Sequence, residues 1–202
     1  MTRQVGKTRV RRSRVLLGIA LLATWAGPAV AAPPAVRICA TCHAEDGLGV
    51  GERRVPIIAA MPAVHLEEAL YAYKDGARQC LYEPLMCENA RELNDEEVAD
   101  LAEYYAGLPR KSVDEPFDKA LAAKGQRLHE THCARCHVPP DDARAEDRLG
   151  PPLHGQRSEY LRYALESYLS GTRENLLPDM EEKILLLEPG DVEALVHYYV
   201  SF

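Results

Sequence analysis

Two pentapeptides, Cys39-Ala40-Thr41-Cys42-His43 and Cys133-Ala134-Arg135-Cys136-His137, decide how this 202-residue sequence folds. Both follow the pattern C-x-x-C-H, which is the attachment signature of c-type haem. Two thiols three positions apart on a helical turn can form thioethers with the two vinyl groups of one porphyrin, and the next residue places an imidazole below the iron. We therefore expect two covalently bound haem c groups. Their attachment residues are Cys39, Cys42, Cys133 and Cys136, and their histidine ligands are His43 and His137.

Two other uses of these cysteines compete with haem attachment. A structural zinc site with four thiolate ligands leaves the histidine after each pair without a role, and the two pairs lie 94 residues apart. A disulfide framework is the second alternative, but a C-x-x-C loop is usually redox-active rather than structural. Haem attachment explains the histidines as well as the cysteines, so we prefer it.

The chain contains the same pattern twice, and this repeat indicates its architecture. A shift of 94 residues superposes the two pentapeptides and carries Met86 onto Met180. Further matches under shifts of 94 or 95 are Tyr104-Tyr105 with Tyr198-Tyr199 and Gly76-x-Arg78 with Gly171-x-Arg173. We therefore expect two similar domains, residues 33–109 and 117–202, joined by a polar linker at residues 110–116.

Met86 and Met180 are the candidates for the sixth ligand of each iron. Each lies 43 residues after its histidine, a spacing that unrelated core methionines would share only by chance. Apart from the initiator, the only other methionine is Met61. A thioether opposite imidazole favours ferrous iron, raises the reduction potential and closes the iron to small ligands. The alternative is that both methionines fill the core.

Helical patterns cover both halves, and no strand-like alternation of useful length occurs. Apolar residues recur with a helical period over residues 62–73, and Gly76 is expected to end that helix. Asn94 is expected to cap the next one, which is followed by early acidic residues. The second half has helical patterns at residues 117–132, 158–170 and 191–199, with Asp191 as the expected cap of the last. We place the two methionines in loops and predict an all-α fold.

The first 32 residues are typical of a secretory signal. They contain six basic residues, no acidic residue, an apolar run at residues 15–23, and the small residues Ala29-Val30-Ala31. The run is shorter than the roughly 20 apolar residues that a membrane-spanning helix needs. An uncleaved anchor is the alternative, and Arg11-Arg12 leaves twin-arginine export open. We expect a periplasmic mature chain with no membrane span.

Removal of this signal makes the chain strongly acidic. Six of the 24 basic residues and none of the 31 acidic residues lie in it, so the formal net charge changes from −7 to −13. This charge argues against nucleic acid, whose phosphates require a basic face. It favours electrostatic docking to a basic partner.

Cys80 and Cys87 have no counterpart in the second half. They flank the first candidate methionine at a separation of seven residues, and an oxidising compartment favours a disulfide between them. A second interpretation is that Cys87, next to Met86, ligates the iron and lowers its potential. Five histidines remain, for which we expect roles other than iron ligation: His65, His129, His132, His154 and His197.

The doubled domain with its two His–Met pairs resembles the class I cytochromes c that occur as tandem domains related by a pseudo-twofold axis. A closer resemblance is to the dihaem cytochrome subunit of flavocytochrome c sulfide dehydrogenase. The stretches that carry it are Phe117-Asp118-Lys119-Ala120-Leu121, Cys133-Ala134-Arg135-Cys136-His137-Val138, Tyr160-Leu161-Arg162-Tyr163-Ala164-Leu165-Glu166 and Pro178-x-Met180-Glu181-x-Lys183. This resemblance implies a partner subunit that contains FAD and oxidises sulfide. The present chain would pass the electrons to a small soluble redox acceptor, without substrate chemistry of its own.

Two other functions remain open from the sequence. One is a free-standing dihaem shuttle to a terminal oxidase, which differs in having only transient, small and polar redox contacts. The other is a dihaem enzyme, such as a peroxidase or a thiosulfate dehydrogenase. An enzyme needs an open iron position or an unusual ligand, and two methionines at equal spacing argue against that.

Overall fold

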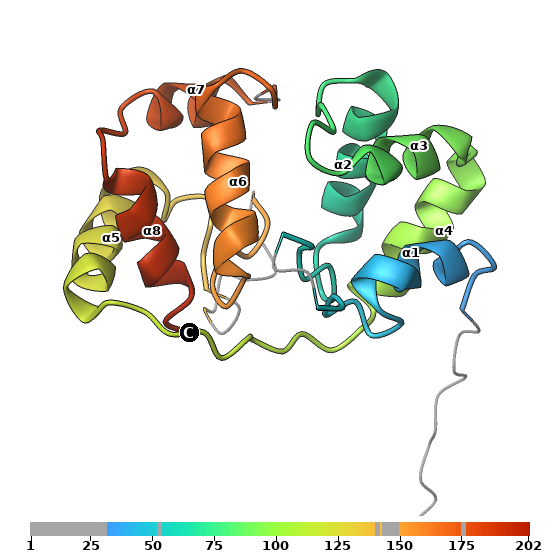
Figure 1. Cartoon of the computed structure of the whole chain (residues 1–202), viewed down its shortest axis with the longest axis horizontal. Coiled ribbons are helices and arrows are strands. Elements are labelled where there is room, and N and C mark those ends of the chain that lie inside the picture. The colour runs from blue at the N-terminus through green and yellow to red at the C-terminus, as the bar shows by residue number, and fades with distance from the viewer. Residues whose placement is uncertain (1–31, 52–53, 140–141, 143–149, 175–176) are drawn as a thin grey trace, which may run out of the picture. The chain divides into compact units, whose positions relative to one another are not determined.

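The computed structural model describes residues 32–51, 54–139, 142, 150–174 and 177–202. The expected all-α fold is confirmed: the described residues form helices, turns and loops, with no strand among them (Figure 1). None of the described helices has the length and apolar character needed to cross a membrane. The predicted signal lies outside the described residues, apart from its last position. The helices are α1 (Val36–His43), α2 (Ala63–Asp75), α3 (Pro84–Glu92), α4 (Asp95–Ala106), α5 (Lys119–His132), α6 (Ser158–Leu169), α7 (Pro178–Ile184) and α8 (Asp191–Tyr199).

In the first half, α2 ends and α4 begins where their sequence signals predict. Helix α2 ends at Gly76, whose φ of 84° lies in the left-handed region that glycine adopts without strain. Helix α4 follows Asn94, whose side-chain oxygen accepts a hydrogen bond from the Glu97 backbone N–H at 3.0 Å. The Glu97 carboxylate accepts one from the Asn94 backbone N–H, also at 3.0 Å. This capping box satisfies two of the backbone donors that a helix start leaves unpaired.

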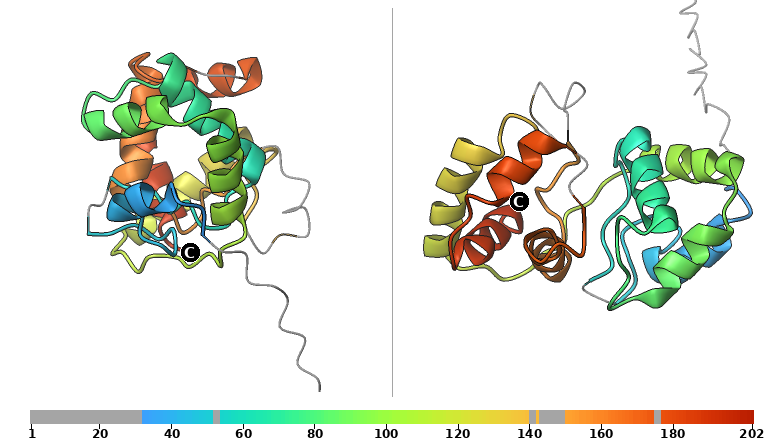
Figure 2. Two further views of the ribbon diagram at one scale, coloured as in Figure 1. Left: turned by 90° about the vertical axis from the view of Figure 1, so that its right-hand side faces the viewer. Right: turned by 90° about the horizontal axis from the view of Figure 1, so that it is seen from above.

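The second half is built on a close crossing of α5 and α8, which pack together (Figure 2). At Gly125 a side-chain Cβ would lie only 2.0 Å from the Ala194 carbonyl oxygen. Only glycine therefore permits this approach of the two helices. In the first half the described residues before α1 are only 32–35, and they contain no helix equivalent to α5.

The start of α8 differs from its prediction. Gly190, with a φ of 85°, occupies the capping position, and Asp191 is the first helical residue. The Asp191 carboxylate accepts a hydrogen bond from the Glu188 backbone N–H at 2.9 Å and pairs with the Lys124 Nζ at 2.7 Å. Because Lys124 lies on α5, Asp191 joins the two crossing helices rather than capping its own.

Each half has its own hydrophobic cluster. In the first half Val36, Met61, Leu66, Leu101 and Tyr105 pack together, and in the second half the cluster consists of Leu161, Leu195, Val196, Tyr199 and Val200. Tyr105 and Tyr199 hold equivalent positions in the repeat and are 3% and 1% exposed. Both C-terminal helices, α4 and α8, thus contribute a buried tyrosine to the core of their half.

Hydrogen bonds connect the two halves directly. The buried side-chain amide of Gln156 accepts from the Ile57 backbone N–H at 2.8 Å and donates to the Ile57 carbonyl at 2.9 Å. The Arg157 guanidinium donates to the Leu48 carbonyl at 2.8 Å. Residues Ala31–Phe202 form one compact unit. The division into domains at residues 33–109 and 117–202 stays a prediction.

Candidate haem sites

The two motif histidines have the same kind of hydrogen-bond partner, a proline carbonyl, in the two halves. His43 Nδ1 lies 3.4 Å from the Pro56 carbonyl oxygen, and His137 Nδ1 lies 2.9 Å from the Pro151 carbonyl oxygen. A carbonyl can only accept, so Nδ1 carries the proton in each ring. The lone pair is then on Nε2, which is the tautomer that an iron ligand requires.

Burial keeps both imidazoles neutral. It lowers the pKa of His43 and of His137, and the hydrogen bond to the proline carbonyl only partly opposes this effect. A neutral imidazole is the form that coordinates a metal. At Gly150 a Cβ would lie 2.6 Å from the His137 Cε1 atom, so glycine is needed there to leave room for the ring.

The motif cysteines are presented by different elements in the two halves. Cys39 and Cys42 lie one turn apart on α1, whereas Cys133 and Cys136 follow directly on the end of α5. All four are free of disulfide bonds. Burial raises the pKa of the Cys39 and Cys133 thiols, so neither is an activated thiolate of the kind that serves as a catalytic nucleophile.

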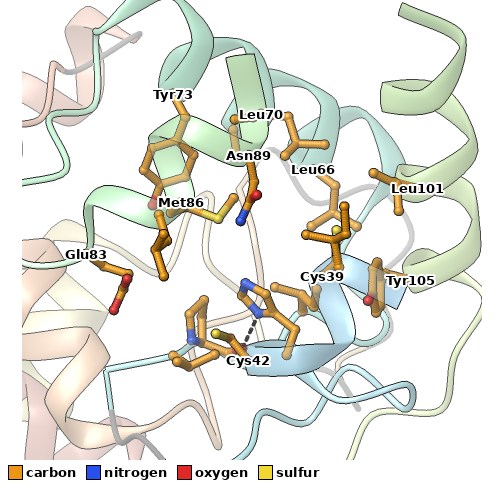
Figure 3. Close-up of a pocket in the computed structure, with 18 of the residues that line it drawn as sticks. Cys39, Cys42, Leu66, Leu70, Tyr73, Glu83, Met86, Asn89, Leu101 and Tyr105 are labelled. Atoms are coloured by element: carbon orange, nitrogen blue, oxygen red, sulfur yellow. Dashed lines mark hydrogen bonds between the residues drawn. The ribbon is translucent and has the colours of Figure 1, made fainter. Parts of the chain in front are cut away.

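A cavity of about 890 Å³ lies beside the first motif, and Figure 3 shows its lining. Cys39 and Cys42 reach it from α1, and Met86 points into it from α3 on the opposite side. Apolar side chains make up much of its wall, among them Leu66, Leu70, Leu93 and Leu101. Its volume lies within the about 300–1,000 Å³ of small-molecule and cofactor sites. A largely apolar cavity with two thiols and an imidazole on one wall and a thioether on the other fits a haem c.

The structure places the two methionines of the first half differently. Met61 is 7% exposed and packs in the core cluster with Val36 and Tyr105. Met86 is only partly buried and belongs to the short helix α3. Met61 also touches the cavity, but its packing is that of a core residue.

Both candidate ligand methionines lie on short helices, so their placement in loops was wrong. Helix α3 begins at Pro84 and α7 at Pro178, and the methionine is the third residue of each helix. Proline suits the first helical position, because its missing N–H would be unpaired there and its φ is already helical. Met180 is partly buried on α7, as Met86 is on α3.

Cys80 and Cys87 are joined by a disulfide in the structure. Cys87 is 4% exposed and lies on α3 next to Met86, so the bond ties this helix to the segment that follows α2. With its sulfur in the disulfide, Cys87 has no thiolate with which to ligate iron.

Several residues around the sites had not been identified from the sequence. The Pro56 carbonyl comes from a loop and carries no motif, whereas Pro151 belongs to residues 149–153, which the sequence pattern places on the proximal-histidine side. Buried His129 lies with Nδ1 3.0 Å from the Tyr199 hydroxyl, which in turn hydrogen-bonds Cys133. In the first half Tyr105 is the counterpart of Tyr199, and its hydroxyl is buried without a hydrogen-bond partner among the described residues.

Comparison with known proteins adds family evidence to this geometry. The model of the cytochrome c family matches residues 36–108. A thiosulfate dehydrogenase electron acceptor of Stutzerimonas stutzeri (strain A1501) is 30% identical, and the match covers 84% of this chain and 81% of that protein. A cytochrome c4 of Thiocapsa roseopersicina is 31% identical over 68% of this chain and 72% of its own length.

Among solved structures, the chain is similar to a thiosulfate dehydrogenase (TsdBA) from Marichromatium purpuratum. The TM-score is 0.69 with 27% sequence identity. The match covers 81% of this chain but only 36% of the other, so the present chain spans about a third of that protein's length.

Proposed function

The chain belongs to the cytochrome c family and is a dihaem electron-transfer protein, and from this premise we propose that it is the electron acceptor of a thiosulfate dehydrogenase. The membership of the chain in the cytochrome c family and its similarity to a cytochrome c4 confirm the expectation of two covalently bound haem c groups. Haem c supplies one-electron oxidation and reduction of its iron. The finer assignment rests on the similarity to a thiosulfate dehydrogenase electron acceptor over most of both chains.

We assign one set of ligands to each half. Cys39 and Cys42 would attach the first haem, and His43 and Met86 would hold its iron. This assignment is supported by the cavity that these four residues share. In the second half the corresponding residues are Cys133, Cys136, His137 and Met180.

The residues of the chain hold the cofactors and exclude water, and none of them is assigned a chemical step on a substrate. The proline carbonyls orient the imidazoles, and the apolar wall of the first cavity lowers the local polarity, which raises the reduction potential. With a histidine and a methionine assigned to each iron, no open iron position would remain. The dehydrogenase partner would therefore perform the oxidation, and this chain would take up its electrons one at a time on two haems.

The sulfide dehydrogenase that the sequence resemblance implied is replaced in this proposal. The relatives support a partner dehydrogenase, but the substrate in their names is thiosulfate rather than sulfide. No finding supports a flavin-containing partner.

The direct test compares donors. The purified oxidised holoprotein is mixed with a thiosulfate dehydrogenase and thiosulfate, and reduction is followed by the haem α-band. A parallel sample receives a flavocytochrome-type sulfide dehydrogenase and sulfide. We expect fast reduction only in the first sample. Fast reduction in the second sample alone would restore the sulfide assignment, and reduction in neither would reject a dehydrogenase partner.

A free-standing shuttle is the second candidate, because the chain is also 31% identical to a cytochrome c4. A shuttle would be reoxidised quickly by a terminal oxidase without forming a lasting complex with any dehydrogenase. Sedimentation of the native periplasmic protein with and without the dehydrogenase separates these two functions. The periplasmic location itself is part of the proposal and rests on the signal pattern of residues 1–32.

A further inference from the structure

Arg78 and Arg173 lie opposite each other at the contact between the two halves. They form an isolated antiparallel bridge. On either side of this pair the Gln79 N–H donates to the Thr172 carbonyl at 3.0 Å, and the Glu174 N–H donates to the Ala77 carbonyl at 2.8 Å. The arginines therefore occupy the non-hydrogen-bonded position, where facing side chains project to the same side and approach most closely.

Both side chains are buried. Arg78 is 7% exposed and Arg173 is 9% exposed. The Arg173 Nε atom is buried and has no hydrogen-bond partner among the described residues. A buried charge is tolerated only when it is paired, and two like charges facing each other add a further cost. A bound anion would offset the cost of burying these two positive charges.

The described part of the chain supplies no such anion. None of its ion pairs includes Arg78 or Arg173. Of the acidic residues on the cavity wall, Glu159 pairs with Arg162 at 2.8 Å and Glu97 caps α4. The groups that do contact the two guanidiniums are aromatic: Arg78 lies 5.4 Å from the centroid of the Tyr73 ring, and Arg173 lies 4.5 Å from that of Tyr168.

A neighbouring histidine, His65, adds no further charge to this region. Burial and, to a smaller extent, the charges of Arg78 and Arg173 lower the pKa of His65 to about 3. His65 is therefore neutral at pH 7. Tyr160, which hydrogen-bonds Arg173, holds the equivalent position under the 95-residue shift. The site thus has two positive charges and no negative charge among the described groups.

The site opens onto a haem cavity. Arg78, His65, Tyr73 and Tyr160 all line the cavity of the first half. Arg173 is the counterpart of Arg78 in the second half. Each haem carries two carboxylates on the porphyrin edge away from its thioethers, and a guanidinium is the side chain best suited to bind a carboxylate through two hydrogen bonds.

We propose that Arg78 and Arg173 form one shared anion-binding site between the halves, which receives a carboxylate from each haem. Each guanidinium then acts on both cofactors. Removal of either positive charge disfavours the added electron on both irons, so the two reduction potentials depend on the same pair of residues. This inference rests on the haem placement proposed above but not on the identity of the dehydrogenase.

The test uses the isolated holoprotein without any dehydrogenase. The reduction potential of each haem is measured by spectroelectrochemistry in the wild type and in the variants Arg78→Gln and Arg173→Gln. The two haems are distinguished by their shifted haem-methyl resonances in proton NMR spectra. In each single variant we expect both reduction equilibria to fall about tenfold, which is 59 mV for one electron. The shift in the double variant should be smaller than the sum of the single shifts, because residues that share one partner are not additive.

Arg157→Gln is the matched control. It also removes one positive charge from the contact between the halves, but its guanidinium binds backbone carbonyls. We expect less than a twofold change in either equilibrium. Arg78→Lys and Arg173→Lys retain the charge and serve as the readout if a glutamine variant loses haem, and they should keep both potentials within about threefold of wild type. A shift confined to one haem in each variant, or an equal shift in Arg157→Gln, would overturn the shared site. Failure of the dehydrogenase assignment would leave these potentials unchanged.

Discussion

Replacement of Gly125 by alanine tests the close crossing of α5 and α8 on which the second half depends. The new Cβ would lie 2.0 Å from the Ala194 carbonyl oxygen, 2.5 Å from its carbon and 2.8 Å from the Tyr198 Cβ. Even close contacts between carbon and oxygen are about 3.3 Å or longer. The two helices would therefore have to separate by about 1 Å, which would loosen the buried residues Leu195 and Tyr199.

The expected cost follows from two opposing effects. Overpacking of a closely packed interface costs about 3 kcal/mol at the upper end of its usual range. Alanine in place of glycine in a helix interior recovers about 1 kcal/mol. The net expectation is a loss of about 2 kcal/mol in the free energy of unfolding. With a urea dependence of about 2 kcal/mol per molar, the unfolding midpoint falls by about 1 M.

Urea unfolding of the holoprotein, followed by far-ultraviolet circular dichroism and by haem absorbance, measures this shift. Gly107→Ala is the matched control at the end of α4, where the nearest atoms to a new Cβ are at 3.4 and 3.6 Å. It should change the stability by less than about 0.5 kcal/mol. A Gly125→Ala protein as stable as the wild type would refute the close crossing.

Three further predictions concern the disulfide, the methionine ligand and the Asp191 carboxylate. Replacement of both Cys80 and Cys87 by alanine should cost about 2.5 kcal/mol by the loop-entropy estimate for a closed loop of this length, measured by urea unfolding. Met86→Ala should remove half of the weak near-infrared band of methionine-ligated ferric haem. Met61→Ala should keep this band but lower the free energy of unfolding by about 2–5 kcal/mol. The reverse pattern would contradict the ligand assignment. Burial raises the pKa of Asp191, but its lysine partner and a backbone N–H lower it more, so that it lies below its ordinary value. The Asp191 carboxylate therefore stabilises the fold above about pH 4, and this contribution is lost as the pH falls through the folded-state pKa. Asp191→Asn should be less stable than the wild type by a constant amount from about pH 5 to 7, and the difference in the free energy of unfolding should shrink below about pH 4.

Local signals predicted most of the helices. Asn94 and Gly76 act through hydrogen bonds and backbone freedom within a few residues, so their effect is visible in the sequence. The helical position of Met86 was also accessible in principle, because Pro84 is a helix-start signal. It was missed because α3 buries only Cys87 and Ala90, so its apolar period is too weak to stand out from a loop, whereas α8, of the same length, buries five residues.

Contacts between distant residues could not be predicted in this way. The repeat relates Arg78 to Arg173, but nothing in it indicates that the two residues meet. The pairing of Gln156 with the Ile57 backbone joins residues 99 positions apart, and one partner is a main-chain group with no sequence signature. The same is true of the proline carbonyls that hold the motif histidines. The sequence therefore identified the candidate ligands of the haem sites, while the groups that orient them depend on tertiary structure.

The bonds from His43 to Pro56 and from His137 to Pro151 have a consequence for the speed of electron exchange. An electron moves between two sites only when the surrounding atoms reach positions that suit both oxidation states. An imidazole anchored through Nδ1 to a main-chain carbonyl would keep its orientation when a haem held there gains or loses an electron, because its hydrogen-bond partner is already in place. Less nuclear movement would then be required at either site, which would lower the barrier to electron exchange.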